Sequence, residues 1–307
     1  MSSLNFYKNC QSEEFLWLKK ESMANADQGC KKNRHEKFYS VEASSKNLPK
    51  KYSTDEDLIS QIREMAKLTV RLQTNIDPQS IRFGTGLIQR VRKERGKHGK
   101  SCPDKTCTKG EGHVYYVITV TTVYHVVSSQ NEAEKTEVLP FFDQEGLKDD
   151  SKAFSVYKLL ETDKETDNFD WCAIECVTHS EELVKDFSDA IENLERLQKA
   201  TYSKYNCDTE KFVVMIGHPH GGPKKVSFGT WSRKQTLKEI RSTQDWCQYR
   251  HDTPSCPGSS GSPVLILGQP LCGYGYWFGH PHNHSAWDKE EHETVTSIGA
   301  NSMAPST

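Results

Sequence analysis

Short β-rich segments recur along most of the chain, and this pattern limits the folds that the chain can adopt. They lie at 68–75, 83–89, 114–127, 136–142, 170–177, 211–216, 224–231, 244–250, 264–267 and 271–278. Short strands that follow one another with few helices between them are typical of an antiparallel barrel or sandwich. We therefore expect an all-β fold.

Two segments with helical periodicity interrupt this series. Ser53 and Glu56 form a capping-box pattern at the start of an amphipathic stretch, which predicts a helix over 54–67. Residues 180–202 place apolar side chains on one stripe and oppositely charged pairs on the other faces. This pattern predicts a longer helix that packs on the outside of the β domain.

Polar segments flank the β-rich region at both ends. Residues 1–52 are polar and irregular, and we interpret them as a flexible arm. The last residues, 281–307, are polar, rich in histidine at their start and without periodicity, and we expect a disordered tail. The predicted domain therefore spans 53–280, with the helical segment at about 180–202 inserted into it.

The turn Pro254–Pro263 runs directly into the apolar strand 264–267 and is the most informative motif. Gly258 and Gly261 bracket Ser260, and glycine adopts a positive φ at low cost. A serine on such a turn can present its hydroxyl beside backbone N–H groups. Acyl transfer needs this arrangement, a nucleophile next to preformed donors for the developing oxyanion. A surface loop rich in serine and glycine is the alternative interpretation.

A histidine and an aspartate upstream of this turn are candidate partners for the serine. His125 is near the end of the strand 114–127, where one ring nitrogen can face a serine and the other a carboxylate. Asp170 heads the apolar segment that follows it, and Asp163 and Asp167 are alternatives. Taken alone, each has a plain structural interpretation, as a core histidine or a strand-capping aspartate.

The order His125, Asp170, Ser260 resembles that of the chymotrypsin-like (PA clan) serine peptidases, and in particular their HtrA-type and trypsin-like peptidase branch. The matching sequence blocks are Gly84-Thr-Gly-Leu-Ile88 with His125-Val-Val127, Ile216-Gly-His-Pro-His-Gly221 followed by Lys224–Gly229, and Pro257-Gly-Ser-Ser-Gly-Ser-Pro263. The resemblance covers roughly residues 68–280. It implies a double antiparallel β-barrel with the catalytic residues in the cleft between the barrels.

The resemblance also implies a function, a serine endopeptidase that acts on protein or peptide substrates without a cofactor. Ser260 would attack the scissile carbonyl, His125 would transfer the proton, and Asp170 would orient the imidazole. The backbone amides of Gly258 and Ser260 would form the oxyanion hole. A catalytically inactive scaffold that binds peptides or proteins is the alternative function.

Two positions depart from the trypsin pattern. Ser259 stands where zymogen-type trypsins carry an acidic residue, so activation by a newly cut N-terminus is not expected. Pro254 stands where trypsins carry the acid that selects Lys or Arg, although Asp252 lies nearby. Together with Pro254, the substrate pocket is expected to be lined by Gly273, Tyr274 and Gly275.

Cysteines and histidines form a further pattern. His98, Cys102, Cys107 and His113 lie in one loop and are ligand types that tetrahedral zinc accepts. Their spacing matches no common zinc finger, so we expect plain loop thiols and no metal, with zinc as the alternative. By resemblance to secreted relatives Cys256 could pair with Cys272, but in a reducing compartment we expect both as thiols.

The charge balance points to no polyanionic partner. The chain has 40 basic and 42 acidic side chains and a net charge of −2, so neither nucleic acid nor a membrane surface is expected as a partner. The N-terminus lacks a basic head followed by an apolar core, and the apolar stretch 114–127 is too short to span a bilayer. We therefore expect a cytoplasmic protein.

Overall fold

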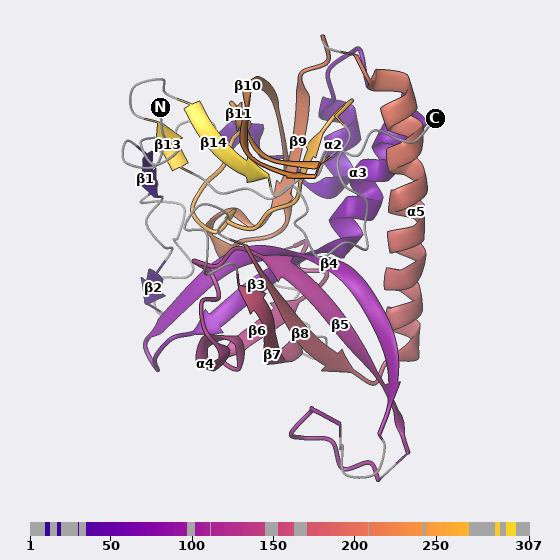
Figure 1. Cartoon of the computed structure of the whole chain (residues 1–307), viewed down its shortest axis with the longest axis vertical. Coiled ribbons are helices and arrows are strands. Elements are labelled where there is room, and N and C mark those ends of the chain that lie inside the picture. The colour runs from indigo at the N-terminus through magenta and orange to yellow at the C-terminus, as the bar shows by residue number, and fades with distance from the viewer. Residues whose placement is uncertain are drawn as a thin grey trace.

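Two antiparallel sheets make up most of the fold, which confirms the predicted all-β, double-barrel class (Figure 1). The computed structural model describes residues 10–12, 17–19, 30, 35–96, 102–110, 112–144, 153–162, 171–207, 209–241, 244–269, 286–288 and 293–298. Asp170, His98, Cys272 and Gly273 to Gly275 lie outside these described residues.

The first sheet closes into a six-stranded barrel, because β4 pairs with β3 on one side and with β5 on the other. Its strands follow the order β4-β3-β6-β7-β8-β5, and the short β2 pairs with the start of β4. Their bounds are β2 (Trp17–Lys19), β3 (Thr69–Asn75), β4 (Ser80–Arg95), β5 (Val114–Thr122), β6 (Thr136–Leu139), β7 (Phe154–Thr162) and β8 (Cys172–Thr178).

The second sheet has the strand order β1-β13-β14-β11-β10-β9-β12. It is built around a long hairpin of β10 and β11, with β9 pairing on the other side of β10. Its strands are β1 (Cys10–Ser12), β9 (Phe212–Gly217), β10 (Lys225–Arg241), β11 (Gln244–His251), β12 (Val264–Ile266), β13 (Ala286–Asp288) and β14 (Glu293–Ile298).

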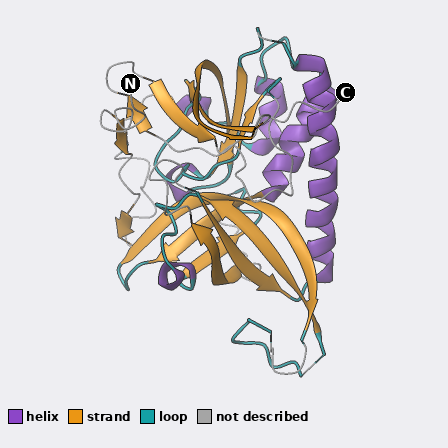
Figure 2. Cartoon of the chain, in the orientation of Figure 1, coloured by secondary structure: helices purple, strands orange, loops and turns teal. Residues whose placement is uncertain are grey.

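Two longer helices lie side by side along one flank of the sheets (Figure 2). Helix α3 (Glu56–Leu68) begins after Asp55, not Ser53, because the Asp55 carboxylate accepts hydrogen bonds from the amides of Asp57 and Leu58. Helix α5 (Glu181–Tyr205) begins where predicted. The remaining helices are the short α2 (Val41–Ser44) and α4 (Gln130–Ala133) and the 3-10 turns η2 (His35–Lys37), η3 (Ser45–Asn47) and η5 (Pro219–Gly221).

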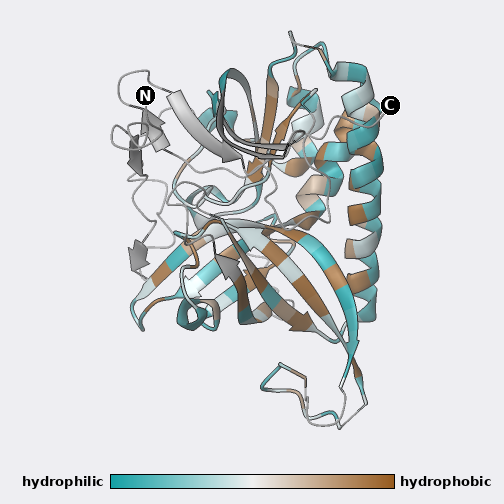
Figure 3. Cartoon of the chain, in the orientation of Figure 1, coloured by the Kyte–Doolittle hydropathy of each residue, from teal (hydrophilic) through white to brown (hydrophobic). Residues whose placement is uncertain are grey.

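One large apolar core extends across the barrel, the flanking helices and β9. Figure 3 shows hydrophobic segments on the barrel strands and bands of hydrophobic residues that alternate with hydrophilic ones along α5. Such banding fits a helix that buries one face only. A smaller apolar cluster lies within the second sheet, around Val213, Met215, Tyr249 and Ile266.

Residues 35–52 are not the flexible arm that their polarity suggested. Tyr39 pairs with Val226 of β10, and its ring stacks on Phe228 with 5.7 Å between the ring centroids. Tyr52 is buried, stacks on Phe212 of β9 and donates a hydrogen bond of 2.6 Å to Glu210. A few aromatic side chains therefore hold a mostly polar segment on the second sheet.

Other differences concern segments with weak patterns. The structure adds β7, whose sequence mixes charged and apolar residues, and places β13 and β14 within the expected tail. The strand predicted over 114–127 ends at Thr122, because the amides of Val126 and Val127 turn back to the carbonyl of Val123. None of the described helices is long and apolar enough to cross a membrane.

Candidate functional site

Thr85 of β4 joins the segments that carry the predicted site residues. Its amide donates to the carbonyl of Ser260 (2.8 Å), and its hydroxyl donates to the carbonyl of Gly258 (2.9 Å). The same hydroxyl accepts from the amide of His218 (3.0 Å), and the Thr85 carbonyl accepts from the hydroxyl of Thr122 (2.7 Å). Thr85 is fully buried, so these hydrogen bonds lie out of water.

The Ser260 turn, residues 254–263, depends on its two glycines. Gly258 has φ 94° and Gly261 has φ 84°, both in the region that favours glycine. A Cβ atom at Gly258 would lie 2.6 Å from the carbonyl oxygen of His218, and one at Gly261 would collide with the carbonyl oxygen of Thr85. Only glycine at both positions lets the turn lie this close to the segment 218–221, at Gly258, and to β4, at Gly261. Ser260 itself keeps 8% of its surface exposed.

Hydrogen bonds fix the peptide group between Pro257 and Gly258. The Pro257 carbonyl accepts a hydrogen bond of 2.6 Å from the amide of His220, and the described residues contain no cis peptide bond. In a trans peptide the N–H points opposite to the C=O, so the Gly258 amide points away from His220. His220 has φ 58°, an uncommon conformation for a residue with a side chain.

Within the same turn, Ser259 faces inward. Its hydroxyl accepts a hydrogen bond from the amide of Cys256 (3.3 Å), and its amide donates to the Cys256 carbonyl (2.9 Å). Ser259 is fully buried, whereas Ser260 is not. The turn therefore uses one serine for internal bonding and leaves the next one partly accessible.

His125 lies on a second turn, residues 123–127, that follows β5. The Arg82 guanidinium donates to the carbonyls of His125 (3.3 Å) and Val126 (3.1 Å). Arg82 also pairs with Glu132, whose carboxylate accepts from the amide and the hydroxyl of Ser128 (both 2.8 Å). Burial alone would raise the pKa of Glu132, but these bonds lower it. A partly buried ionic network thus holds the backbone on which His125 lies.

The His125 turn and the Ser260 turn meet β4 at consecutive residues. Val126 packs on Gly84, where a Cβ atom would lie 2.6 Å from a Val126 methyl group, and Ser260 binds Thr85. Cys172, at the start of β8, pairs with Thr122 at the end of β5. The turns that carry His125 and Ser260 therefore both contact β4, at Gly84 and Thr85, while Asp170 falls outside the described residues.

His218 is a structural residue rather than a second candidate base. It is fully buried, and burial, together with the nearby charges of Lys224 and Arg71, lowers its pKa well below the usual value for histidine. Its Nδ1 donates to the carbonyl of Gly222 (3.0 Å), which fixes a neutral tautomer. This histidine supports the turn that carries His220.

The described part of the predicted substrate pocket is used for internal contacts. Pro254 is buried, and its carbonyl accepts a hydrogen bond from the Ser227 hydroxyl (2.9 Å). Asp252 accepts from the amide of Thr230 (2.6 Å) at the edge of β10. The other predicted pocket residues, Gly273 to Gly275, lie outside the described residues.

A first cluster of thiols and imidazoles, the hairpin cluster, lies at the β4–β5 loop. It consists of Cys102, Cys107, His113 and His179, whose ligand atoms all lie within 4.8 Å of one another. His98, which was considered with these residues, lies outside the described residues, and the structure adds His179, since the end of β8 comes beside the loop. His179 lies far along the chain from the loop, so sequence spacing gave no signal for it.

A second cluster, the arm–turn cluster, was missed by sequence analysis. It consists of Cys30, His35, His220 and Cys256, again with all ligand atoms within 4.8 Å of one another. Cys30 and His35 come from the N-terminal segment, His220 from η5 and Cys256 from the Ser260 turn. Among the described cysteines, Cys30 is thus the nearest to Cys256. The sequence had suggested Cys272 as a possible disulfide partner of Cys256.

The family model of the trypsin-like peptidase domain matches residues 108–269. Similar solved structures are the Rv3671c protease in its inactive form (TM-score 0.41, 15% identity, 80% of this chain and 90% of that chain) and the active form of that protease from M. tuberculosis (0.42, 16%, 80% and 82%). Another is the HtrA-type protease AlgW with a tripeptide (0.42, 14%, 78% and 58%). No curated protein sequence matches the chain.

Proposed function

Because the chain belongs to the trypsin-like peptidase family, we propose that it is a serine endopeptidase with Ser260 as nucleophile, His125 as general base and Asp170 as the orienting carboxylate. Peptides or proteins are the substrates that the family implies, and no cofactor takes part in the reaction. A cytoplasmic location stays a prediction from the sequence.

The observation that carries this proposal is the attachment of both turns to Gly84 and Thr85. Nucleophile and base must be held in mutual register, since an error of about 1 Å can cost about 100-fold in rate. The backbone of Ser260 is bonded to Thr85, and the neighbour of His125 packs on Gly84. Adjacent residues of one strand are a rigid common support for the two groups.

The proposed reaction is acyl transfer to the serine hydroxyl. Ser260 Oγ attacks the scissile carbonyl while His125 takes the hydroxyl proton, and the same proton then passes to the leaving amine. Asp170 stabilises the imidazolium formed in between. Water, activated by His125, hydrolyses the acyl-enzyme and releases the second product.

The amides of Gly258 and Ser260 are the proposed oxyanion donors. The hydrogen bond from the His220 amide to the Pro257 carbonyl supports this role. Because the peptide is trans, this bond points the Gly258 amide in the opposite direction, away from His220. Loss of one such donor costs about 3 kcal/mol of transition-state stabilisation.

Hydrolysis of a denatured protein substrate tests the proposal. We expect Ser260→Ala and His125→Ala each to lower kcat/KM by at least about 10⁴-fold. Ser203→Ala, which removes an exposed hydroxyl on α5, is the matched control and should leave the rate unchanged. Residual activity near the wild-type level in purified Ser260→Ala would contradict the assignment, and a folded but inactive wild type would favour the peptide-binding scaffold.

A further inference from the structure

The arm–turn cluster has the dimensions of a tetrahedral metal site. Its two sulfur atoms, Cys30 Sγ and Cys256 Sγ, are 3.8 Å apart, and Cys256 Sγ lies 3.3 Å from His35 Nε2. Zinc bonds of about 2.3 Å to sulfur and about 2.0–2.1 Å to nitrogen give tetrahedron edges of about 3.8 Å between sulfurs and about 3.6 Å between sulfur and nitrogen. The sulfur–sulfur separation matches its edge and the sulfur–nitrogen separation is slightly shorter than its edge, whereas a disulfide bond would be about 2.05 Å long.

We propose that Cys30, His35, His220 and Cys256 bind a zinc ion. Two thiolates and two imidazoles in tetrahedral arrangement are the donor set that selects zinc among the common divalent metals. The rings of His35 and His220 face each other edge to face at 5.2 Å between centroids, as two ligands of one ion can. The four ligands come from three separate segments, so the ion would join them.

This zinc site lies next to the proposed oxyanion-hole peptide, between Pro257 and Gly258. Its effect on catalysis therefore rests on the proposed function. His220 and Cys256 are both ligands, and the peptide between Pro257 and Gly258 is hydrogen-bonded to the His220 amide. The uncommon φ of 58° at His220 must be maintained for that bond to form. Zinc bound to both side chains would hold this geometry, so loss of the metal should slow the acylation of Ser260.

The hairpin cluster supports a second zinc site on independent evidence. Cys107 Sγ lies 3.4 Å from both His113 Nε2 and His179 Nε2, and Cys102 Sγ lies 3.5 Å from His179 Nε2. These distances again match the sulfur–nitrogen edge of about 3.6 Å.

The far sides of both hairpin imidazoles are arranged as in metal-bound histidines. His113 Nδ1 donates to the carbonyl of Gly110 (2.7 Å), which leaves the Nε2 lone pair directed at the sulfurs. His179 Nδ1 faces the Asp104 carboxylate at 3.9 Å. A carbonyl or carboxylate behind the ring is the usual partner of a zinc-bound histidine. This ion would attach the β4–β5 loop to the end of β8.

Zinc content separates the two sites, because each set of variants is the control for the other. The full chain, expressed with zinc and dialysed against metal-free buffer, should contain two zinc ions by elemental mass spectrometry. Cys30→Ser and His35→Gln should each leave one, and so should Cys107→Ser and His179→Asn. Cobalt in place of zinc should give the intense visible absorption of a tetrahedral thiolate site, reduced by half in each variant.

Each of the two zinc sites would be excluded by a different result. An unchanged zinc content in both Cys30→Ser and His35→Gln would exclude the arm–turn site. An unchanged zinc content in both Cys107→Ser and His179→Asn would exclude the hairpin site. A Cys30–Cys256 disulfide, found by mapping alkylated peptides of the zinc-loaded protein, would also exclude the first.

Labelling by a fluorophosphonate tests the coupling to Ser260. We expect Cys30→Ser and His35→Gln to be labelled at least tenfold more slowly than wild type, and His179→Asn at the wild-type rate. If the first two lose one zinc yet are labelled normally, the coupling is wrong and the proposed function stands. If wild type holds two zinc ions but is never labelled, the proposed function fails and the metal sites stand.

Discussion

Thr85 makes four hydrogen bonds with backbone or side-chain groups that are far apart in the sequence, and it is fully buried. Its hydroxyl connects Gly258 in the Ser260 turn with His218 before η5. Replacing it by an isosteric methyl group would leave a buried carbonyl and a buried amide without this partner, which costs about 1–3 kcal/mol per group.

The first prediction compares two substitutions at this position. Thr85→Val should lower kcat/KM by about 100-fold, because the Ser260 turn loses its register with β4. Thr85→Ser keeps the hydroxyl and should stay within about threefold of wild type. Steady-state hydrolysis of a peptide substrate gives both values, and equal rates in the two variants would show that the hydroxyl does not position the turn.

Arg82 holds the turn that carries His125, because its guanidinium donates hydrogen bonds to the carbonyls of His125 and Val126. We expect Arg82→Met to lower kcat about tenfold with little change in KM, since the proposed base His125 moves while substrate contacts remain. Arg90→Met, an exposed substitution on the same strand, is the control. A change confined to KM in Arg82→Met would contradict a role in holding His125.

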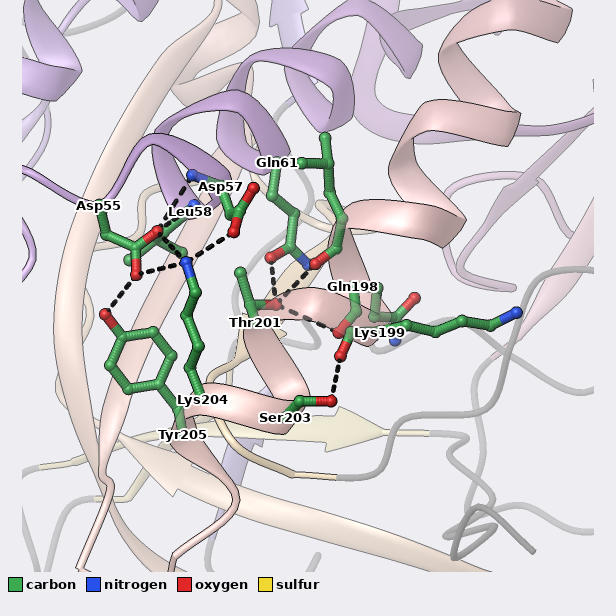
Figure 4. Close-up of polar contacts among 11 residues, drawn as sticks. Asp55, Asp57, Leu58, Gln61, Gln198, Lys199, Thr201, Ser203, Lys204 and Tyr205 are labelled. Carbon is green, nitrogen blue, oxygen red and sulfur yellow. Dashed lines mark hydrogen bonds and ion pairs between the residues drawn. The ribbon is translucent and has the colours of Figure 1, made fainter. Parts of the chain in front are cut away.

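At the scale of elements, the pair α3 and α5 is held together by polar contacts around the start of α3 (Figure 4). Asp55 caps α3 and also accepts from Tyr205 (2.7 Å) and Lys204 (3.1 Å) at the end of α5. Burial would raise the pKa of Asp55, but these bonds outweigh it and lower the pKa. Further along, the Thr201 hydroxyl donates to Gln61 across the helix interface (2.7 Å).

Two substitutions separate the cap from the charge. Asp55→Ala loses both and should lower the free energy of unfolding by about 2 kcal/mol, whereas Asp55→Asn keeps a good N-cap and should lose about 1 kcal/mol or less. Urea titration followed by circular dichroism measures both. Equal losses in the two variants would mean that the cap contributes nothing beyond the ion pairs.

Elements with a strong local pattern could be predicted from the sequence, and elements defined by pairing could not. The amphipathic stripe of α5 and the alternation of β3 are visible in the chain itself. Strand β7 has a mixed composition and exists because β6 and β8 flank it. The turn residues Ser260 and His125 follow from local motifs, but the bonding role of Thr85 appears only once β4 lies against two distant turns.

The ligands of the proposed zinc sites show the same limit. His113 was named in the alternative zinc interpretation because of its place in the loop, whereas His179 joins it only because β8 ends beside the β4–β5 hairpin. Cys30 and His35 reach the Ser260 turn through tertiary packing of a segment whose polarity suggested an arm. Spacing in the sequence finds ligands from one loop and misses those that the fold brings together.

At the scale of the whole molecule, buried histidines make stability depend on pH. Burial lowers the pKa of His251 from 6.5 to about 4, and Nδ1 of this side chain accepts from the amide of Thr253 (3.2 Å). The unfolded chain therefore binds a proton at a pH where the folded protein does not. The contribution is present above about pH 6.5 and is lost as the pH falls towards 4.

We expect the free energy of unfolding to fall between pH 7 and pH 4, with His251 accounting for up to about 3 kcal/mol. His251→Asn keeps an acceptor for Thr253 and should show a smaller decrease. Urea titrations at pH 7 and pH 4.5, both with a chelator so that metal release does not contribute, provide the comparison. The same decrease in variant and wild type would exclude His251 as a source of this pH dependence.

The most direct test of the central claim is the site at which a fluorophosphonate reacts with the zinc-loaded protein. We predict one phosphonyl group per chain, mapped by peptide mass spectrometry to Ser260, with no adduct after His125→Ala and none in Ser260→Ala. An adduct on another serine, or a folded wild-type protein that forms no adduct at all, would contradict the assignment.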